Sequence, residues 1–171
     1  YREGAYEKAT EQFKKLYAKS PFNTSYLSRL LSCYQETDQF SKAKQLLISK
    51  LKKNPEQGFL YVYLGHTYDG QQEKELARKN YALALKSIDK NPSYGPIIGR
   101  IFKNYNLLDS AILAYEKIMI INKNADYNFQ IAEIHGEKGD FKKMFESCID
   151  LVDKKEQYTG LIQRLTSKYI T

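Results

Sequence analysis

The sequence predicts an all-α fold built from a repeated pair of helices. One residue type recurs at one spacing, because successive members of the series Ala9, Ala43, Ala77 and Ala111 are each 34 residues apart. Apolar residues within each unit follow helical spacing, and no segment shows the alternation of a strand. The composition, 42% apolar and 27% charged over 171 residues, is that of a folded chain.

Further positions share this spacing, and coincidence does not explain so many agreements. They are Pro21 and Pro55, then Tyr34, Tyr68 and Phe102, then Gly65 and Gly99, and finally His135 and Tyr169. The unit that contains His135 is shifted by one residue, so its positions follow those of the preceding unit after 33 residues. A recurrence of this length is typical of architectures in which one supersecondary unit stacks on the next.

Each unit is predicted to contain two amphipathic helices. In the clearest unit, the first helix carries Tyr61, Leu64, Gly65 and Tyr68 on one face, and the second carries Ala77, Tyr81, Ala84 and Ile88. The small residue on each helix allows the two backbones to approach closely. We expect helices over residues 2–18, 24–36, 39–53, 58–70, 73–90, 95–104, 107–121, 125–137, 140–153 and 156–170.

The boundaries between units are marked by turn-forming residues. Asn54-Pro55 and Asn91-Pro92 end second helices, because the residue before proline avoids helical geometry. Gly95-Pro96 delays the start of the helix that follows. The sequence therefore predicts one solenoid domain over residues 1–171, divided into a half repeat at 1–21, repeats at about 24–57, 58–91, 92–124 and 125–158, and a half repeat at 159–171.

The order of residues within one unit resembles the tetratricopeptide repeat. That repeat has an aromatic residue, Leu-Gly and Tyr at fixed offsets, then Ala and an aromatic residue, and here they are Tyr61, Leu64-Gly65, Tyr68, Ala77 and Tyr81. The resemblance implies a right-handed superhelix, an α-solenoid of antiparallel helix pairs. It also implies that the first helices of the pairs line a concave groove, where a peptide or helix of a partner protein binds. We expect this chain to be a piece of a longer array.

Transferred by position, the resemblance places several side chains on the inner surface. The aromatic members Phe59, Tyr63 and Phe129 are expected to be partly exposed, and exposed aromatics beside arginine are typical anchors of an interface. The alternative is that these aromatics pack between adjacent first helices. The candidate partner-binding residues are Arg29, Phe59, Tyr63, His66, Arg100 and Phe129. Further inner positions are Ser25, Ser28, Ser32, Gln35, Val62, Asp69, Ile97, Lys103, Asp126, Gln130 and Glu133.

One subtype of the family is not favoured. Binders of chaperone C-terminal tails hold the terminal carboxylate with Lys and Asn one turn apart on a first helix. The corresponding pairs here are Ser28/Ser32, Val62/His66, Pro96/Arg100 and Phe129/Glu133. None of them is Lys/Asn, so we predict no carboxylate clamp of this type.

The sequence predicts no enzyme and no cofactor. General acid–base catalysis needs a titratable group beside a partner, and the two histidines, His66 and His135, fall two units apart. His135 also occupies the position of Tyr34 and Phe102, which indicates a packing role. Cys33 and Cys148 show neither disulfide nor metal spacing. No glycine-rich phosphate loop is present in the sequence, and no metal site is expected.

Two alternatives to peptide binding stay open, one from charge and one from apolar surface. The net charge is +7, and residues 1–54 carry 11 basic and 5 acidic side chains, so a nucleic-acid partner is a less favoured alternative. Uncovered apolar faces at the terminal half repeats predict concentration-dependent self-association.

No apolar run is long enough for a membrane-spanning helix. Two isolated thiols are compatible with a bacterial cytoplasm and also with a periplasmic or secreted setting, so the compartment stays open.

Overall fold

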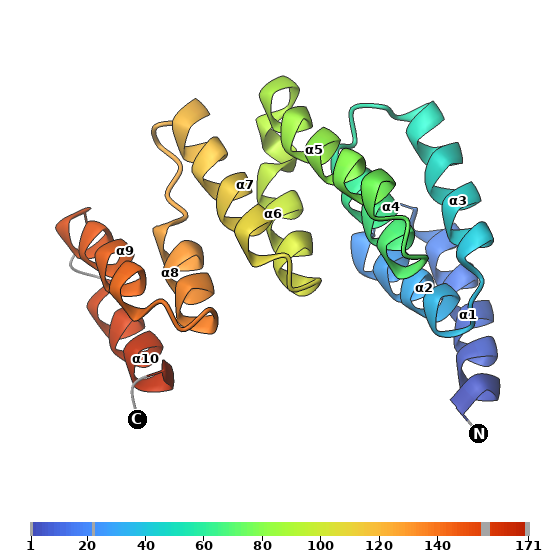
Figure 1. Ribbon diagram of the computed structural model, residues 1–171, viewed down its shortest axis with the longest axis horizontal. Helices are drawn as coiled ribbons and strands as arrows, with labels where there is room; N and C mark the ends of the chain where they lie inside the picture. Colours follow the sequence, from blue (N-terminus) through green and yellow to red (C-terminus); the bar gives the residue numbers. More distant parts are fainter. Residues whose placement is uncertain (1, 22, 155–157, 170–171) are drawn as a thin grey trace. The chain divides into compact units, whose positions relative to one another are not determined.

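The computed structural model describes residues 2–21, 23–154 and 158–169, and every regular element within those ranges is helical (Figure 1). The chain divides into two compact units, Tyr1–Ser87 and Ile88–Thr171, and each is considered by itself below. The predicted all-α fold of helix pairs is confirmed for these ranges. The assignment of the whole chain to one domain and the long-range superhelical path stay predictions.

The first unit contains α1 (Arg2–Lys19), α2 (Thr24–Glu36), α3 (Phe40–Lys53), α4 (Phe59–Gly70) and most of α5 (Lys74–Lys90). Helix α2 packs against α1, α3 and α4, so the helices of successive pairs lie side by side. The Asn23 side chain caps α2 by accepting hydrogen bonds from the backbone N–H groups of Ser25 and Tyr26 at 3.0 and 3.3 Å.

The second unit begins with the end of α5 and the short 3₁₀ helix η1 (Pro92–Tyr94). It continues with α6 (Gly95–Asn104), α7 (Leu108–Ile121), α8 (Asn128–Glu137), α9 (Phe141–Lys154) and α10 (Thr159–Tyr169). Helix α6 packs on α7, and α8 contacts α7, α9 and α10. Pro96 lies in the first turn of α6, where its missing N–H breaks no helical hydrogen bond.

The turn inside each pair has the same backbone geometry in all four repeats. Asp38, Gln72, Asn106 and Gly139 have positive φ angles of 53°, 63°, 58° and 74°. The residue after each one donates its N–H to the carbonyl of Tyr34, Tyr68, Phe102 or His135, at 2.7 to 3.0 Å. These are Schellman caps, which satisfy carbonyl groups that the helix end leaves free. The cap positions preserve the spacing of 34, 34 and 33 residues seen in the sequence.

The expected helix boundaries agree with the structure to within one residue, apart from two. Helix α8 begins at Asn128, three residues later than the sequence predicted; in the preceding residue, the Tyr127 ring stacks on Tyr115 and the backbone N lies 3.3 Å from Met119 Sδ. The last helix begins at Thr159 and is described to Tyr169. Residues 1, 155–157 and 170–171, where some predicted segments begin or end, lie outside the described residues.

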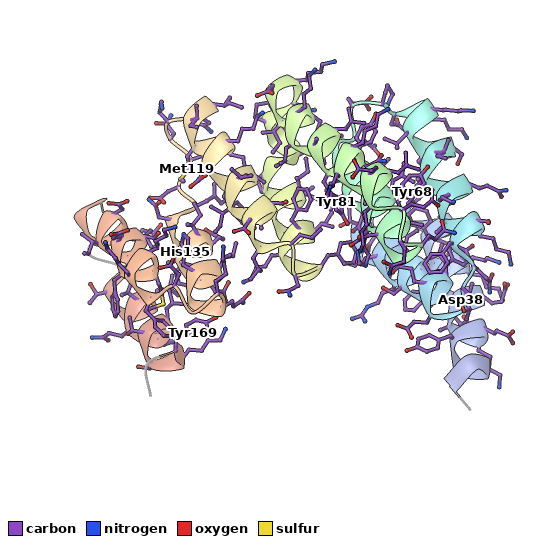
Figure 2. All side chains as sticks on the ribbon, in the orientation of Figure 1. Asp38, Tyr68, Tyr81, Met119, His135 and Tyr169 are labelled. Carbon is purple, nitrogen blue, oxygen red and sulfur yellow. The ribbon has the colours of Figure 1, made fainter. Side chains whose placement is uncertain are left out.

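The interior of each pair is filled by a matched set of large and small side chains. Gly65 on α4 lies under the ring of Tyr81, and Gly99 on α6 lies under that of Tyr115 (Figure 2 labels Tyr81). The first repeat has Leu31 and Leu47 at the equivalent positions, and the fourth has Ala132 and Cys148. Those four residues are at most 3% exposed. The two facing positions are therefore closely packed in every pair, although the volume is divided differently between the two side chains.

Candidate partner-binding groove

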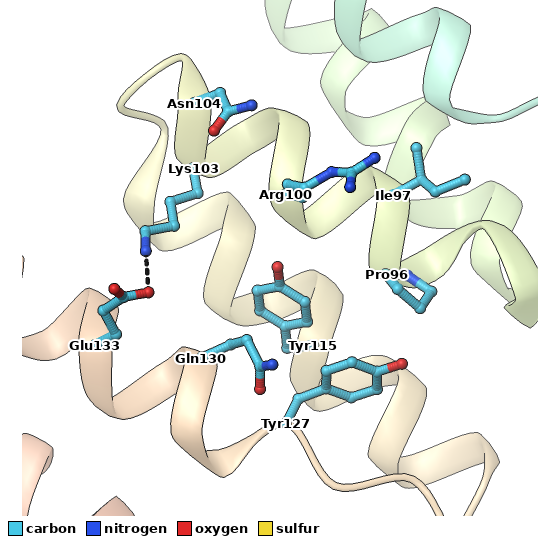
Figure 3. Close-up of a pocket in the computed structure, with 9 residues that line it drawn as sticks. All are labelled: Pro96, Ile97, Arg100, Lys103, Asn104, Tyr115, Tyr127, Gln130 and Glu133. Carbon is cyan, nitrogen blue, oxygen red and sulfur yellow. Dashed lines mark hydrogen bonds and ion pairs between the residues drawn. The ribbon is translucent and has the colours of Figure 1, made fainter. Parts of the chain in front are cut away.

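A cleft of about 400 Å³ lies between α6 and α8 in the second unit (Figure 3). Helix α6 presents one face to it, because its lining residues are spaced by a helical turn. Helix α8 contributes two side chains, and the residue before it, together with one from α7, supplies the aromatic part. The lining residues are Pro96, Ile97, Arg100, Lys103, Asn104, Tyr115, Tyr127, Gln130 and Glu133.

Two stacked tyrosines form the aromatic wall of this α6–α8 cleft. The rings of Tyr115 and Tyr127 are 5.1 Å apart between centroids and inclined by 22°. Burial raises the pKa of Tyr115 to about 12, with a smaller opposing effect of the Arg100 charge. The phenol therefore keeps its proton at neutral pH and can donate a hydrogen bond. In Figure 3 the Tyr115 hydroxyl points toward α6, and that of Tyr127 points toward Pro96.

A network of ion pairs closes one end of the cleft. Lys103 on α6 forms an ion pair with Glu133 on α8, and its Nζ also lies 3.3 Å from Glu137. Lys168 on α10 approaches Glu133 from the other side at 3.9 Å. The positive charge of Lys103 is thus matched by two carboxylates. These pairs connect three neighbouring helices, each the first helix of its pair.

Arg100 is the cation of the cleft that has no such partner. It is exposed, and within the described ranges no ion pair or hydrogen bond forms on its guanidinium. Beside it lie the side-chain amides of Asn104 and Gln130, which can donate and accept at once. Figure 3 shows the Gln130 amide directed toward the Tyr115 ring. The cleft therefore combines one free cation, two amides and an aromatic wall.

The first unit holds four of the six candidate residues, and two of them are not where the sequence suggested. Phe59 and Tyr63 were expected to be partly exposed, but they are only 8% and 3% exposed. The Tyr63 hydroxyl donates to the Thr24 carbonyl at 3.4 Å and so connects α4 with α2. Their expected exposure is therefore wrong, and the alternative of packing between first helices fits Tyr63. Whether either residue takes part in binding stays a prediction.

The other two candidates of the first unit are accessible. Arg29 on α2 is exposed, and His66 on α4 is half-buried. Burial lowers the pKa of His66, against a smaller raising effect of Asp69. His66 is therefore mainly neutral at pH 7, and its imidazole can act as a hydrogen-bond donor and acceptor.

In the second unit, the cleft includes Arg100 but not Phe129. Phe129 is half-buried and packs on the cluster of Ala132, Met144, Cys148 and Leu165, so its ring is used in the core of the last pairs. Of the other inner positions expected for this unit, Ile97, Lys103, Gln130 and Glu133 line the cleft, whereas Asp126 does not.

Sequence reasoning missed the aromatic wall. Tyr115 occupies a core position of the repeat, and Tyr127 lies in a segment that was expected to be helical. One signal was present: Gly99 leaves room for a ring that reaches across to the inner side.

Among the described residues, no three His, Cys, Asp or Glu side chains are placed to hold a metal ion. No helix in those ranges is both long and apolar enough to cross a membrane. Cys33 and Cys148 are buried, and burial raises the pKa of both thiols, which disfavours the reactive thiolate.

The helix pairs and their spacing define the class, an all-α protein of tetratricopeptide-like repeats. No protein-family model and no curated protein matches the sequence. Among solved structures, MamA is similar with 21% identity over 93% of this chain and 94% of that one, at a TM-score of 0.42. A thermophilic TPR protein of Thermus thermophilus is similar with 16% identity over 96% and 90%, at 0.47. BtubC from P. vanneervenii is similar with 15% identity over 97% and 90%, at 0.30. Since these scores are below 0.5, the fold assignment rests on the chain's own helix pairs.

Proposed function

We propose that this chain is a protein-interaction scaffold and that the α6–α8 cleft receives an extended segment of a partner protein. The observation that carries the proposal is the lining of the cleft. Side-chain amides such as Asn104 and Gln130 can pair with a peptide backbone, which offers one donor and one acceptor per residue. The half-buried Tyr127 ring, held by stacking on the buried Tyr115, offers rigid apolar area, which is typical of interface anchors. In this proposal the chain performs no chemistry of its own.

The size of the cleft supports a narrow ligand. A volume of about 400 Å³ lies at the lower end of ligand-site volumes, which suits a few residues of an extended strand rather than a globular surface. The cleft is lined from two first helices and therefore follows the direction in which successive pairs stack. Arg29 and His66 stay candidates for partner contacts within the first unit.

A display selection tests this proposal directly. Random peptides on phage are selected on the full chain, and the affinity of recovered synthetic peptides is measured by fluorescence anisotropy. We expect Gln130→Ala combined with Ile97→Ala to weaken binding about tenfold or more, since both side chains line the cleft. The matched control is Gln45→Ala combined with Ile48→Ala, which alters exposed residues of α3. Equal losses in both double variants, or no selected binder, would contradict the proposal.

Self-assembly is a second candidate, favoured by one feature of α9. Phe141, Phe145 and Ile149 follow each other by one helical turn and are 41%, 41% and 59% exposed. An apolar stripe of this kind is typical of an interaction surface. Sedimentation velocity across a concentration series tests it, with Phe145→Gln as the variant. A protein that stays monomeric at the highest concentration removes this candidate.

A further inference from the structure

The charges of the α6–α8 cleft do not cancel locally. Two cations from α6 line it, and they differ in what surrounds them. Lys103 is held by Glu133 and Glu137, so an incoming anion would have to compete with two carboxylates. Arg100, one turn earlier, has neither an ion pair nor a hydrogen bond on its guanidinium within the part of the chain that the structure describes. The uncompensated positive charge of the cleft is therefore concentrated at Arg100.

The surroundings of Arg100 fit a charged group that carries an apolar neighbour. Pro96 and Ile97, one turn before Arg100, form an apolar part of the same wall. The Tyr115 phenol also lines the cleft and is protonated at neutral pH, so it is a hydrogen-bond donor and not an anion. A planar guanidinium can grip a carboxylate through two parallel N–H donors, which no neutral side chain of the cleft can do.

We propose that the segment bound in the α6–α8 cleft carries an internal Asp or Glu next to an apolar residue, with its carboxylate on Arg100 and the apolar side chain against Pro96 and Ile97. This inference rests on the proposed function of the cleft. A carboxylate is favoured over a phosphoryl group because one free guanidinium matches a single negative charge. A dianionic phosphate would need a second cation, and Lys103 is already occupied.

Glu133 then acts as a counter-charge that limits the cleft to one acidic contact. Glu133→Gln keeps the size and shape of this side chain and removes one of the charges that hold Lys103. Lys103 would then be neutralised by Glu137 alone, so acidic peptides should bind more tightly to this variant. Arg100→Gln should have the opposite effect, because it removes the cation that carries the contact.

The experiment uses the full chain and the peptides recovered by display. Each acidic peptide is synthesised with its Glu and with Gln in its place, and both are measured by anisotropy. We expect the recovered peptides to be enriched in Asp or Glu beside an apolar residue, and the Glu form to bind about tenfold more tightly than the Gln form. Arg100→Gln should remove that difference, while Arg78→Gln, which alters an exposed arginine of α5, should leave it. Glu133→Gln should increase it several-fold.

Each other outcome has a definite meaning. Peptides that compete for the cleft but bind equally in Glu and Gln forms overturn this inference and leave the scaffold proposal standing. A preference for a phosphoserine peptide over the Glu form also overturns it. The absence of any cleft-dependent binder overturns both. Circular dichroism of each variant checks that the helices are retained, and an Arg100→Gln chain with unchanged helicity and an unchanged Glu preference contradicts the assigned role of Arg100.

Discussion

The ring of Tyr115 lies so close to the backbone of Gly99 that an added Cβ at Gly99 would be 2.7 Å from Tyr115 Cζ. Gly65 and Tyr81 repeat this relationship one unit earlier, where an added Cβ would be 2.5 Å from Tyr81 Cε1. In both cases the missing side chain lets a first helix and a second helix cross at short range. This contact also turns Tyr115 into part of the cleft.

Gly99→Ala is expected to destabilise the protein by about 1–3 kcal/mol, because the new methyl group overlaps the buried Tyr115 ring. Urea unfolding at pH 7 measures the loss. Gly160→Ala is the control, since a Cβ at Gly160 meets nothing within 4 Å. If Gly99→Ala is as stable as the parent, the close crossing of α6 and α7 is not real.

A smaller side chain at Tyr115, opposite Gly99, should reduce the loss of stability caused by Gly99→Ala. In a Tyr115→Leu background we expect the cost of Gly99→Ala to fall by about 0.5 kcal/mol or more, because contacting residues are coupled. Additive effects in this double-mutant cycle would show that the two residues do not share one space.

The Schellman caps predict opposite effects for two substitutions at equivalent positions. Gln72 has φ of 63° and Gly139 has φ of 74°, the left-handed region that disfavours side chains. Gln72→Gly should stabilise the chain by about 0.5–1 kcal/mol, and Gly139→Ala should destabilise it by about 1 kcal/mol. Thermal unfolding of both variants checks this pair. A loss of stability in Gln72→Gly would contradict the shared cap geometry.

Stability is expected to fall as the pH drops below about 6.5, and His135 contributes to this dependence. Burial lowers the pKa of His135 from the ordinary 6.5, and the nearest charges come from Asp140, Lys143, Lys138 and Glu116. Since the folded pKa is lower, the unfolded chain takes up the proton first, so acidification favours unfolding until the pH is below the folded pKa as well. Urea midpoints between pH 7.5 and 5.5 should show this slope.

His135→Phe should reduce the slope, because it removes the titrating imidazole. Phenylalanine suits this position, since Phe102 occupies the equivalent position in the preceding repeat. His66 has a pKa lowered by burial as well, so His66→Gln should reduce the slope separately. The lowered pKa of Asp140 affects stability only near and below its ordinary 3.8, which is outside the measured window. An unchanged slope in His135→Phe would contradict the assignment.

Binding of nucleic acid is expected to be weak and sensitive to salt. Helix α3 carries five lysines and no acidic residue, but Lys44 already pairs with Glu73 at 3.4 Å. Lys50 lies over the Tyr17 ring, 4.5 Å from its centroid, and burial lowers its pKa. We predict that single-stranded oligonucleotide binding, measured by anisotropy, is lost by about 150 mM salt. Binding that persists there, and that is weakened by Lys52→Gln with Lys53→Gln, would favour a nucleic-acid function.

Most of the fold was predictable because its signals are local. Helical spacing, proline positions and the recurrence of Tyr34, Tyr68 and Phe102 depend only on neighbours in the chain. The start of α8 was not, because a contact between Tyr127 and Tyr115 decides it. Such a contact joins residues of different helices, and no local pattern encodes it.

The candidate site was predictable only in part. The resemblance to the repeat family placed Arg100 and Lys103 on one face of α6, and both line the same cleft. The burial of Phe59 and Tyr63 was missed, because periodicity shows on which face a residue lies but not how closely the adjacent first helix approaches it. Periodicity also could not predict that Lys103 is neutralised, since the two carboxylates belong to another repeat.

The pairing of Lys103 with Glu133 and Glu137 has a consequence for how specificity is stored in this molecule. Lys103 is a second group that could bind an anion in the cleft, but the two neighbouring carboxylates neutralise its charge. Replacing Glu133 would leave Glu137 as the one carboxylate that neutralises it, and no wall of the cleft would have to move. A single substitution that removes a carboxyl group can therefore change which ligands the cleft prefers, while the helices that form the cleft stay unchanged.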